Sequence, residues 1–193
     1  MKLELAKSAG FCYGVRRAVR MAEQAAEQGR ACVMLGPIIH NNSVIEYLAS
    51  LGVGLIQRPE EAEPGTAVII RSHGEGRAAY EALAERGCPL IDATCPNVSR
   101  IHQIVSQAEE AGRQAVIIGS PTHPEVAAIA GWCAHPLVFE GVQALSDWLE
   151  GEPERRNLPV TMVSQTTSTQ IIWDKCVEKA KKECTNLKIF DTI

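Results

Sequence analysis

The sequence predicts an α/β fold made of repeated small modules, each a parallel sheet flanked by helices. Short runs that are apolar on both faces, such as 31–35 (ACVML) and 67–70 (AVII), alternate with longer segments of helical periodicity. Strands that alternate with helices in this way form parallel sheets, because each crossover helix packs back onto a sheet face. The AVII run recurs at 115–118. This recurrence indicates a first module over 1–95 and a second over 96–193.

Local residue patterns justify the individual elements. A helix is expected over 15–28, because Val15, Val19 and Ala22 share one face and Gly29 ends it. Similar patterns predict further helices at 41–50, 75–86, 97–111, 124–133, 142–149 and 168–182. Apolar or alternating runs predict strands at 3–6, 31–35, 67–70, 89–91, 115–118, 137–139, 160–163 and 187–190.

Composition excludes several classes of protein. Of the 193 residues, 46% are hydrophobic and 22% charged, which is ordinary for a globular chain. The 19 lysines and arginines are spread along a chain of net charge −4, so no basic stripe for a nucleic-acid backbone is expected. No apolar run approaches the roughly 20 residues of a membrane span. Residues 1–10 lack the layout of a signal peptide. We therefore expect a cytoplasmic protein, in a compartment where thiols stay reduced.

Reactive side chains recur where a predicted strand gives way to a helix. These junctions carry Cys12, His40, His73, Cys95 and His123. In a parallel sheet the carboxyl ends of the strands share one edge, where ligands bind. The helix N-termini at that edge attract anions. The sequence therefore predicts a polar pocket for an anionic, phosphorylated small molecule, with two thiols beside it.

The seven cysteines divide into two groups. Cys12 and Cys95 lie at helix starts, where a thiolate is stabilised, but they form no C-x-x-C pair. Thiolates on separate loops can hold either a metal ion or an iron–sulfur cluster, and the residues alone leave both open. The remaining cysteines are expected to be packing residues, namely Cys32, Cys88, Cys133, Cys176 and Cys184.

Six segments in order resemble one known family. They are AKSAGFCYGVRRAV, LGPIIHNN, IIRSHGEG, DATCPNV, THPEV and SQTT. Together they resemble the 4-hydroxy-3-methylbut-2-enyl diphosphate reductases, the last enzymes of the non-mevalonate isoprenoid pathway. The resemblance implies that Cys12 and Cys95 are two of three thiolates of a [4Fe–4S] cluster. The fourth iron would be the open site for the substrate hydroxyl.

The resemblance also implies roles for residues around the substrate. His40, His73 and His123 would line the diphosphate pocket, together with Thr166 and Thr167. Catalysis would rest on Glu125 as the source of protons, with His123 and Thr166 beside the substrate oxygen. Two electrons, from a ferredoxin or flavodoxin type of donor, and protons would remove the hydroxyl as water. The products would be isopentenyl and dimethylallyl diphosphate.

One departure from the family concerns its third cluster cysteine. In the family that cysteine opens a third module, in a C-x-A-T segment, whereas this chain ends at KIFDTI. The resemblance therefore implies two of the three modules of a trefoil-like arrangement. The third module would be a missing partner, and we expect the 193-residue chain to be inactive alone.

The residues are also compatible with two other functions. A zinc-dependent phosphohydrolase could use His40, His73, His123 and a cysteine. A non-catalytic binder of phosphorylated metabolites would need only the anion sites at the helix starts.

Overall fold

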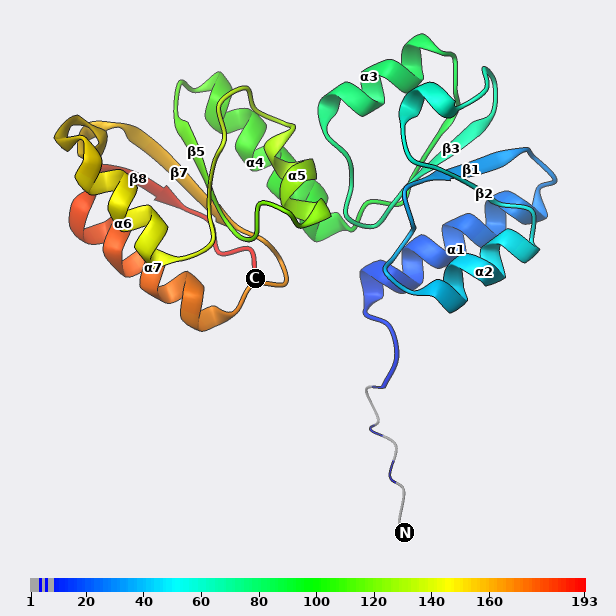
Figure 1. Cartoon of the computed structure of the whole chain (residues 1–193), viewed down its shortest axis with the longest axis horizontal. Helices are drawn as coiled ribbons and strands as arrows, with labels where there is room; N and C mark the ends of the chain where they lie inside the picture. Colours follow the sequence, from blue (N-terminus) through cyan, green and yellow to red (C-terminus); the bar gives the residue numbers. More distant parts are fainter. Residues whose placement is uncertain (1–3, 5, 7–8) are drawn as a thin grey trace. The chain divides into compact units, whose positions relative to one another are not determined.

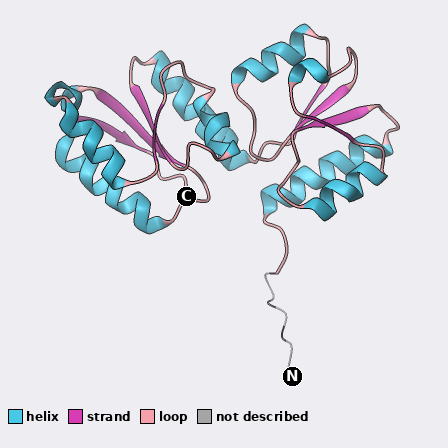
Figure 2. Ribbon diagram, in the orientation of Figure 1, coloured by secondary structure: helices cyan, strands magenta, loops and turns pink. Residues whose placement is uncertain are grey.

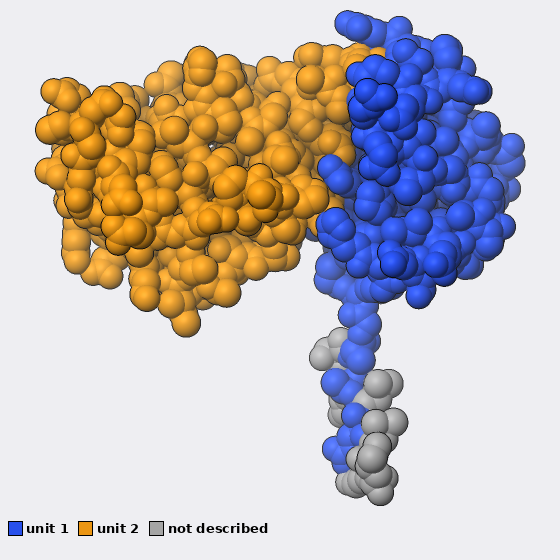
Figure 3. Space-filling view, viewed as in Figure 1, with its two compact units in different colours: residues 1–72, 83–95 blue, residues 73–82, 96–193 orange. Residues whose placement is uncertain are grey.

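The computed structural model describes residues 4, 6 and 9–193. They form two compact units, which differ in colour in Figure 3: Met1–Ser72 with Leu83–Cys95, and His73–Ala82 with Pro96–Ile193. Each unit holds one four-stranded parallel sheet flanked by helices (Figures 1 and 2). Of the strand expected at 3–6, residues 3 and 5 lie outside the described part.

The first unit is built around a sheet of order β2-β1-β3-β4. Its strands are β1 (Cys32–Leu35), β2 (Gly54–Ile56), β3 (Ala67–Ile70) and β4 (Leu90–Asp92). Its helices are α1 (Tyr13–Glu27), α2 (Asn42–Ser50) and a short 3-10 helix, Pro59–Glu61. Ala18 and Ala22 of α1 are fully buried against Met34 and Ile69 of the sheet. Small residues on this face of α1 let the helix lie close to the strands.

The second unit repeats this plan with sheet order β6-β5-β7-β8. Its strands are β5 (Gln114–Ile118), β6 (Leu137–Phe139), β7 (Pro159–Ser164) and β8 (Asn186–Ile189). Its helices are α4 (Pro96–Glu110), α5 (Pro124–Ala130), α6 (Val142–Gly151), the 3-10 helix Pro153–Asn157, and α7 (Gln170–Glu183). Helices α4 and α5 share one core layer, and α6 and α7 share the other. Helix α3 (Arg77–Glu85) is divided, because its residues 77–82 group with this unit and 83–85 with the first.

A matching glycine contact marks the two sheets as repeats of one design. Gly36 follows β1 and Gly119 follows β5, and each faces a side chain that lies just beyond the neighbouring strand. A Cβ on Gly36 would lie 2.9 Å from Nη1 of Arg71, and one on Gly119 would lie 2.8 Å from Cβ of Gln165. The predicted α/β fold of repeated modules with parallel sheets is therefore confirmed.

Several element boundaries differ from the predicted ones for local reasons. The edge strand β2 was not predicted, because its three residues begin with Gly54, and glycine is depleted in strands. The helix expected at 75–86 begins at Arg77, since Gly74 adopts a left-handed φ of 74° in the preceding turn. The helix expected at 124–133 ends at Ala130, where Gly131 caps it. No helix in the described part of the chain is long and apolar enough to cross a membrane.

Replacing Gly131 with alanine is expected to destabilise the second unit. A Cβ there would lie 2.6 Å from Cα of Gly76, and neither backbone can yield as a flexible side chain would. Such overpacking costs about 1–3 kcal/mol of unfolding free energy. Denaturant unfolding followed by circular dichroism measures it. Gly141→Ala is the matched control, because its Cβ meets no atom within 4 Å. Equal stability of the two variants would contradict the prediction.

Candidate functional site

Both candidate cluster thiols, Cys12 and Cys95, belong to the first unit. Cys12 is exposed and stands at the N-cap of α1, with extended backbone at φ −64° and ψ 168°. Cys95 follows β4 and is half-buried. A Cβ on Gly14 would lie 2.7 Å from Sγ of Cys95. The sulfur of Cys95 therefore rests against the first turn of the helix that Cys12 caps.

A buried serine connects Cys95 to the loop after β1. The Cys95 backbone N–H donates to the carbonyl oxygen of Ser72 at 2.9 Å. The Ser72 hydroxyl in turn donates to the carbonyl oxygen of Ile38 at 3.0 Å. That loop leads to His40, which is exposed and directly precedes Asn41, the N-cap of α2. Cys12, Cys95 and His40 thus belong to the first unit.

The other five cysteines are poor candidates for ligands. Cys32, Cys88 and Cys176 are buried. Burial raises the pKa of Cys176 to about 11, and burial with nearby Glu109 raises that of Cys133 to about 11. Both therefore stay protonated at neutral pH, whereas metals bind the thiolate. Cys12 and Cys95 fit an iron–sulfur cluster as two thiol donors at helix starts. Within the described residues no group of three His, Cys, Asp or Glu side chains could hold a metal ion.

A buried carboxylate lies at the carboxyl edge of the second sheet. Glu125, in the first turn of α5, is 2% exposed. Just after β7, Thr166 donates its backbone N–H to Oε1 at 2.6 Å and its hydroxyl to Oε2 at 2.8 Å. A buried carboxylate needs such partners, because its desolvation is costly. Both oxygens of Glu125 are therefore held in place by one residue of a neighbouring strand end.

Two histidines accompany this carboxylate. His123 caps α5, and its Nδ1 accepts the backbone N–H of Glu125 at 3.1 Å. In the neutral ring the hydrogen then sits on Nε2, which makes Nε2 a donor. The ring of His73 meets that of His123 edge-on, with centroids 5.5 Å apart. His73, His123, Glu125 and Thr166 all belong to the second unit, as does the exposed Thr167.

Gln165 is a member of this cluster that the sequence analysis did not single out. Its Oε1 accepts the backbone N–H of Ser120 at 3.2 Å, and its Nε2 donates to the hydroxyl of Thr167 at 2.7 Å. The side chain is 8% exposed and fills the space above Gly119. Gln165 thus fixes the loops after β5 and β7 to each other. Its place directly after a buried strand was the signal that could have identified it.

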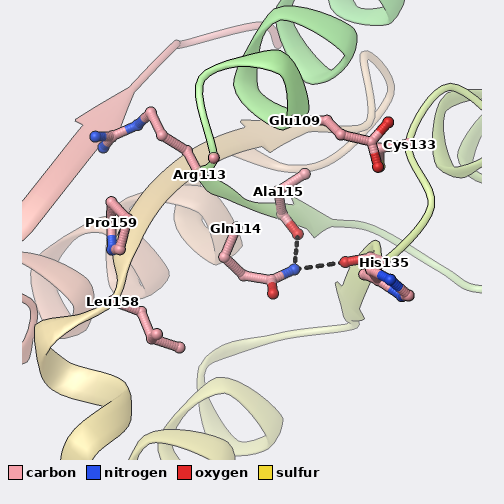
Figure 4. A pocket seen from close by; sticks show the side chains of 9 residues that line it. Glu109, Arg113, Gln114, Ala115, Cys133, His135, Leu158 and Pro159 are labelled. Carbon is pink, nitrogen blue, oxygen red and sulfur yellow. Dashed lines mark hydrogen bonds between the residues drawn. The ribbon is translucent and has the colours of Figure 1, made fainter.

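A separate cavity of about 260 Å³ lies at the opposite edge of the second sheet (Figure 4). It opens beside Gln114 and Pro159, the first residues of β5 and β7. The Gln114 amide donates to the carbonyl oxygens of His135 and Ala115, at 2.5 and 3.1 Å. Arg113 directs its guanidinium at the protein backbone and neighbouring side chains. These groups hold the fold together, so we assign the reactive site to the carboxyl edge instead.

Comparison with known proteins gives consistent matches. The family model described as LytB protein matches residues 3–193. The 4-hydroxy-3-methylbut-2-enyl diphosphate reductase of Clostridium perfringens strain SM101 is 37% identical, over 98% of this chain and 66% of its own length. The reductase of the same name from Caldanaerobacter subterraneus subsp. tengcongensis is 36% identical, over all of this chain and 67% of the relative. This chain therefore spans about two thirds of the length of such relatives.

Solved structures match in the same way. One (E)-4-hydroxy-3-methyl-but-2-enyl diphosphate reductase superposes with a TM-score of 0.83 at 35% identity, over 97% of this chain and 66% of that one. A reductase from Plasmodium falciparum gives a TM-score of 0.85 at 24% identity, over 95% of this chain and 57% of that one, and shows the shared fold. The family resemblance drawn from six motifs is thus confirmed. Since the family model covers all but the first two residues, the chain belongs to the LytB protein family.

Proposed function

We propose that this chain supplies the diphosphate-binding and proton-delivering parts of a 4-hydroxy-3-methylbut-2-enyl diphosphate reductase. The observation that carries the proposal is the buried Glu125, whose two oxygens are bonded by Thr166 beside His123. A fixed, water-excluded carboxyl group is suited to proton delivery. Relatives that are 36% and 37% identical over nearly all of this chain carry the name of this reductase.

Cys12 and Cys95 would hold a [4Fe–4S] cluster with a third thiolate from outside this chain. When bound, such a cluster supplies electrons and a Lewis-acidic iron. The turn that precedes Cys95 has a counterpart at the end of the second unit. Oδ1 of Asp92 accepts the N–H of Thr94 at 2.9 Å in the turn before Cys95, and Oδ1 of Asp191 accepts the N–H of Ile193 at 3.3 Å. The turn at 191–193 therefore resembles the turn that precedes Cys95 in the first unit.

The histidines would bind the diphosphate. His123 presents Nε2 as a donor, because its Nδ1 accepts from Glu125. We assign the same task to His73, whose ring contacts that of His123, and to His40 in the first unit. The hydroxyl of Thr167, oriented by Gln165, would add a neutral donor. Imidazole and hydroxyl groups bind phosphate oxygens well without a large excess of positive charge.

Glu125 and Thr166 would deliver the proton that turns the leaving hydroxyl into water. The hydroxyl of Thr166 bonds to Oε2 of Glu125, so a proton at this carboxyl oxygen can pass through the Thr166 oxygen to the substrate. Overall, the allylic alcohol takes up two electrons and two protons, loses its C–O bond and releases one water. The products would be isopentenyl and dimethylallyl diphosphate.

The remaining components of the reaction would come from elsewhere. We propose a ferredoxin or flavodoxin type of electron donor, and a third module without which this chain is inactive. We place the reaction in the cytoplasm, where thiols stay reduced, and all seven cysteines are free thiols in the structure.

Anaerobic reconstitution with iron and sulfide tests the proposal. In the full-length protein we expect a brown absorbance that bleaches on reduction, lost in Cys95→Ser but kept in Cys184→Ser, whose half-buried thiol is no candidate ligand. Stoichiometric zinc without that colour would favour the phosphohydrolase. If the protein binds neither iron nor zinc but still binds inorganic diphosphate, the remaining interpretation is a non-catalytic binder.

A further inference from the structure

We propose that Arg17 is a positioning residue that clamps the turn carrying Cys95 onto the helix capped by Cys12. The clamp would set the spacing between the two thiols. The inference rests on the proposed function in one respect, namely that these two thiols act as a pair.

The contacts of Arg17 cross from one thiol-bearing element to the other. Arg17 lies in the second turn of α1, five residues after Cys12. Its Nη1 donates to the carbonyl oxygen of Thr94 at 3.1 Å, and its Nη2 donates to that of Asp92 at 3.4 Å. The guanidinium is a planar fork, so two bonds to one turn fix its direction as well as its distance.

The turn that Arg17 binds is also held by hydrogen bonds of its own. Asp92 accepts the backbone N–H of Thr94 at 2.9 Å and also its hydroxyl. The next residue, Cys95, donates its N–H to Ser72 at 2.9 Å. These hydrogen bonds hold the backbone of the turn in one conformation. The position of the Thr94 carbonyl, which Arg17 binds, therefore determines the position of Cys95.

The packing at Gly14 provides a second and independent observation. With α1 held against the turn, Sγ of Cys95 comes so close to Gly14 that a Cβ would lie 2.7 Å away. Glycine is a poorer helix former than alanine, so helix propensity does not explain a glycine at this position. Close approach and clamp together indicate that the separation between α1 and Cys95 is a controlled feature of this unit.

Amide hydrogen exchange in the 193-residue chain tests the clamp directly. In Arg17→Ala we expect the protection of the Cys95 amide to fall about tenfold or more, because hydrogen bonds to charged groups contribute about 1.5–3 kcal/mol. Arg17→Lys keeps the charge but not the fork, and should restore protection only in part. Arg16→Ala is the matched control, since Arg16 is an exposed neighbour on the same helix. Exchange in α7 serves as a reference for global stability. Unchanged protection of Cys95 in Arg17→Ala would overturn the proposal.

Titration with Cd²⁺ alone tests the consequence for the thiols. We expect the wild-type chain to bind Cd²⁺ more tightly than Cys95→Ser, and Arg17→Ala to lose about 10–100-fold in affinity, as outer-shell variants of metal sites do. Equal binding by the wild type and Cys95→Ser would count against the pairing in the proposed function. If Cys95→Ser weakens Cd²⁺ binding but Arg17→Ala binds Cd²⁺ as tightly as the wild type, only the positioning role of Arg17 would be overturned.

Discussion

Glu125→Gln in the full-length protein is expected to reduce turnover by at least about 100-fold, while the diphosphate substrate still binds within a few-fold of its normal affinity. General acid catalysis contributes about 10²–10⁴ to a rate, and an amide has no proton to transfer. The replacement is nearly isosteric. Its oxygen can still accept the Thr166 N–H that now donates to Oε1 at 2.6 Å. The loss should therefore fall on kcat and not on substrate binding.

Steady-state kinetics with a chemical reductant, combined with direct titration of the substrate, separate these two effects. Glu110→Gln is the control, because Glu110 is an exposed glutamate at the end of α4. Cluster content should be measured in each protein, so that a loss of iron is not mistaken for a loss of the acid. Normal turnover in Glu125→Gln would remove Glu125 from the proton path.

Gly14→Ala is expected to lower the iron content of the reconstituted protein by about tenfold or more. The new Cβ would lie 2.7 Å from Sγ of Cys95, so the sulfur must move or the helix must shift. Alanine is a better helix former than glycine, so helix propensity does not oppose the substitution. A loss of iron from a folded variant would therefore come from the changed position of Cys95 relative to helix α1.

Iron and acid-labile sulfide per chain, measured beside a thermal melt, distinguish these possibilities. The melt should show a folded protein, and the cluster should be depleted. Gly141→Ala controls for the substitution itself, since its Cβ meets nothing within 4 Å. Full iron loading of Gly14→Ala would show that the Cys95 sulfur is not a ligand in its present position.

The local pattern of the chain predicted most of the elements but not the contacts that join them. Buried strands such as β3 and β5 were recognised because they are apolar on both faces and bounded by turn residues. The strand β2 was not predicted because it begins with Gly54, and glycine is depleted in strands. Strand pairing supplies its stability, and pairing is not visible in a single segment.

The same limit applies to the site. The strand-to-helix junctions identified Cys12, Cys95 and His123 as candidates, because their positions follow from the order of the elements, whereas the role of Glu125 came from the family resemblance. Neither the bond from Arg17 to Thr94 nor the contact of Gly14 with Cys95 could be predicted, since each joins residues about 80 positions apart. Gln165 lies in the SQTT segment, but its hydrogen bonds to Ser120 and Thr167 could not be predicted from that segment alone.

The paired glycine contacts have a consequence for how such a protein could have arisen. Gly36 with Arg71, and Gly119 with Gln165, occupy equivalent places in the two sheets. A duplicated gene segment would produce this correspondence, with the backbone inherited and the side chains free to diverge. The two units now differ in chemistry, because the first holds Cys12 and Cys95 and the second holds Glu125.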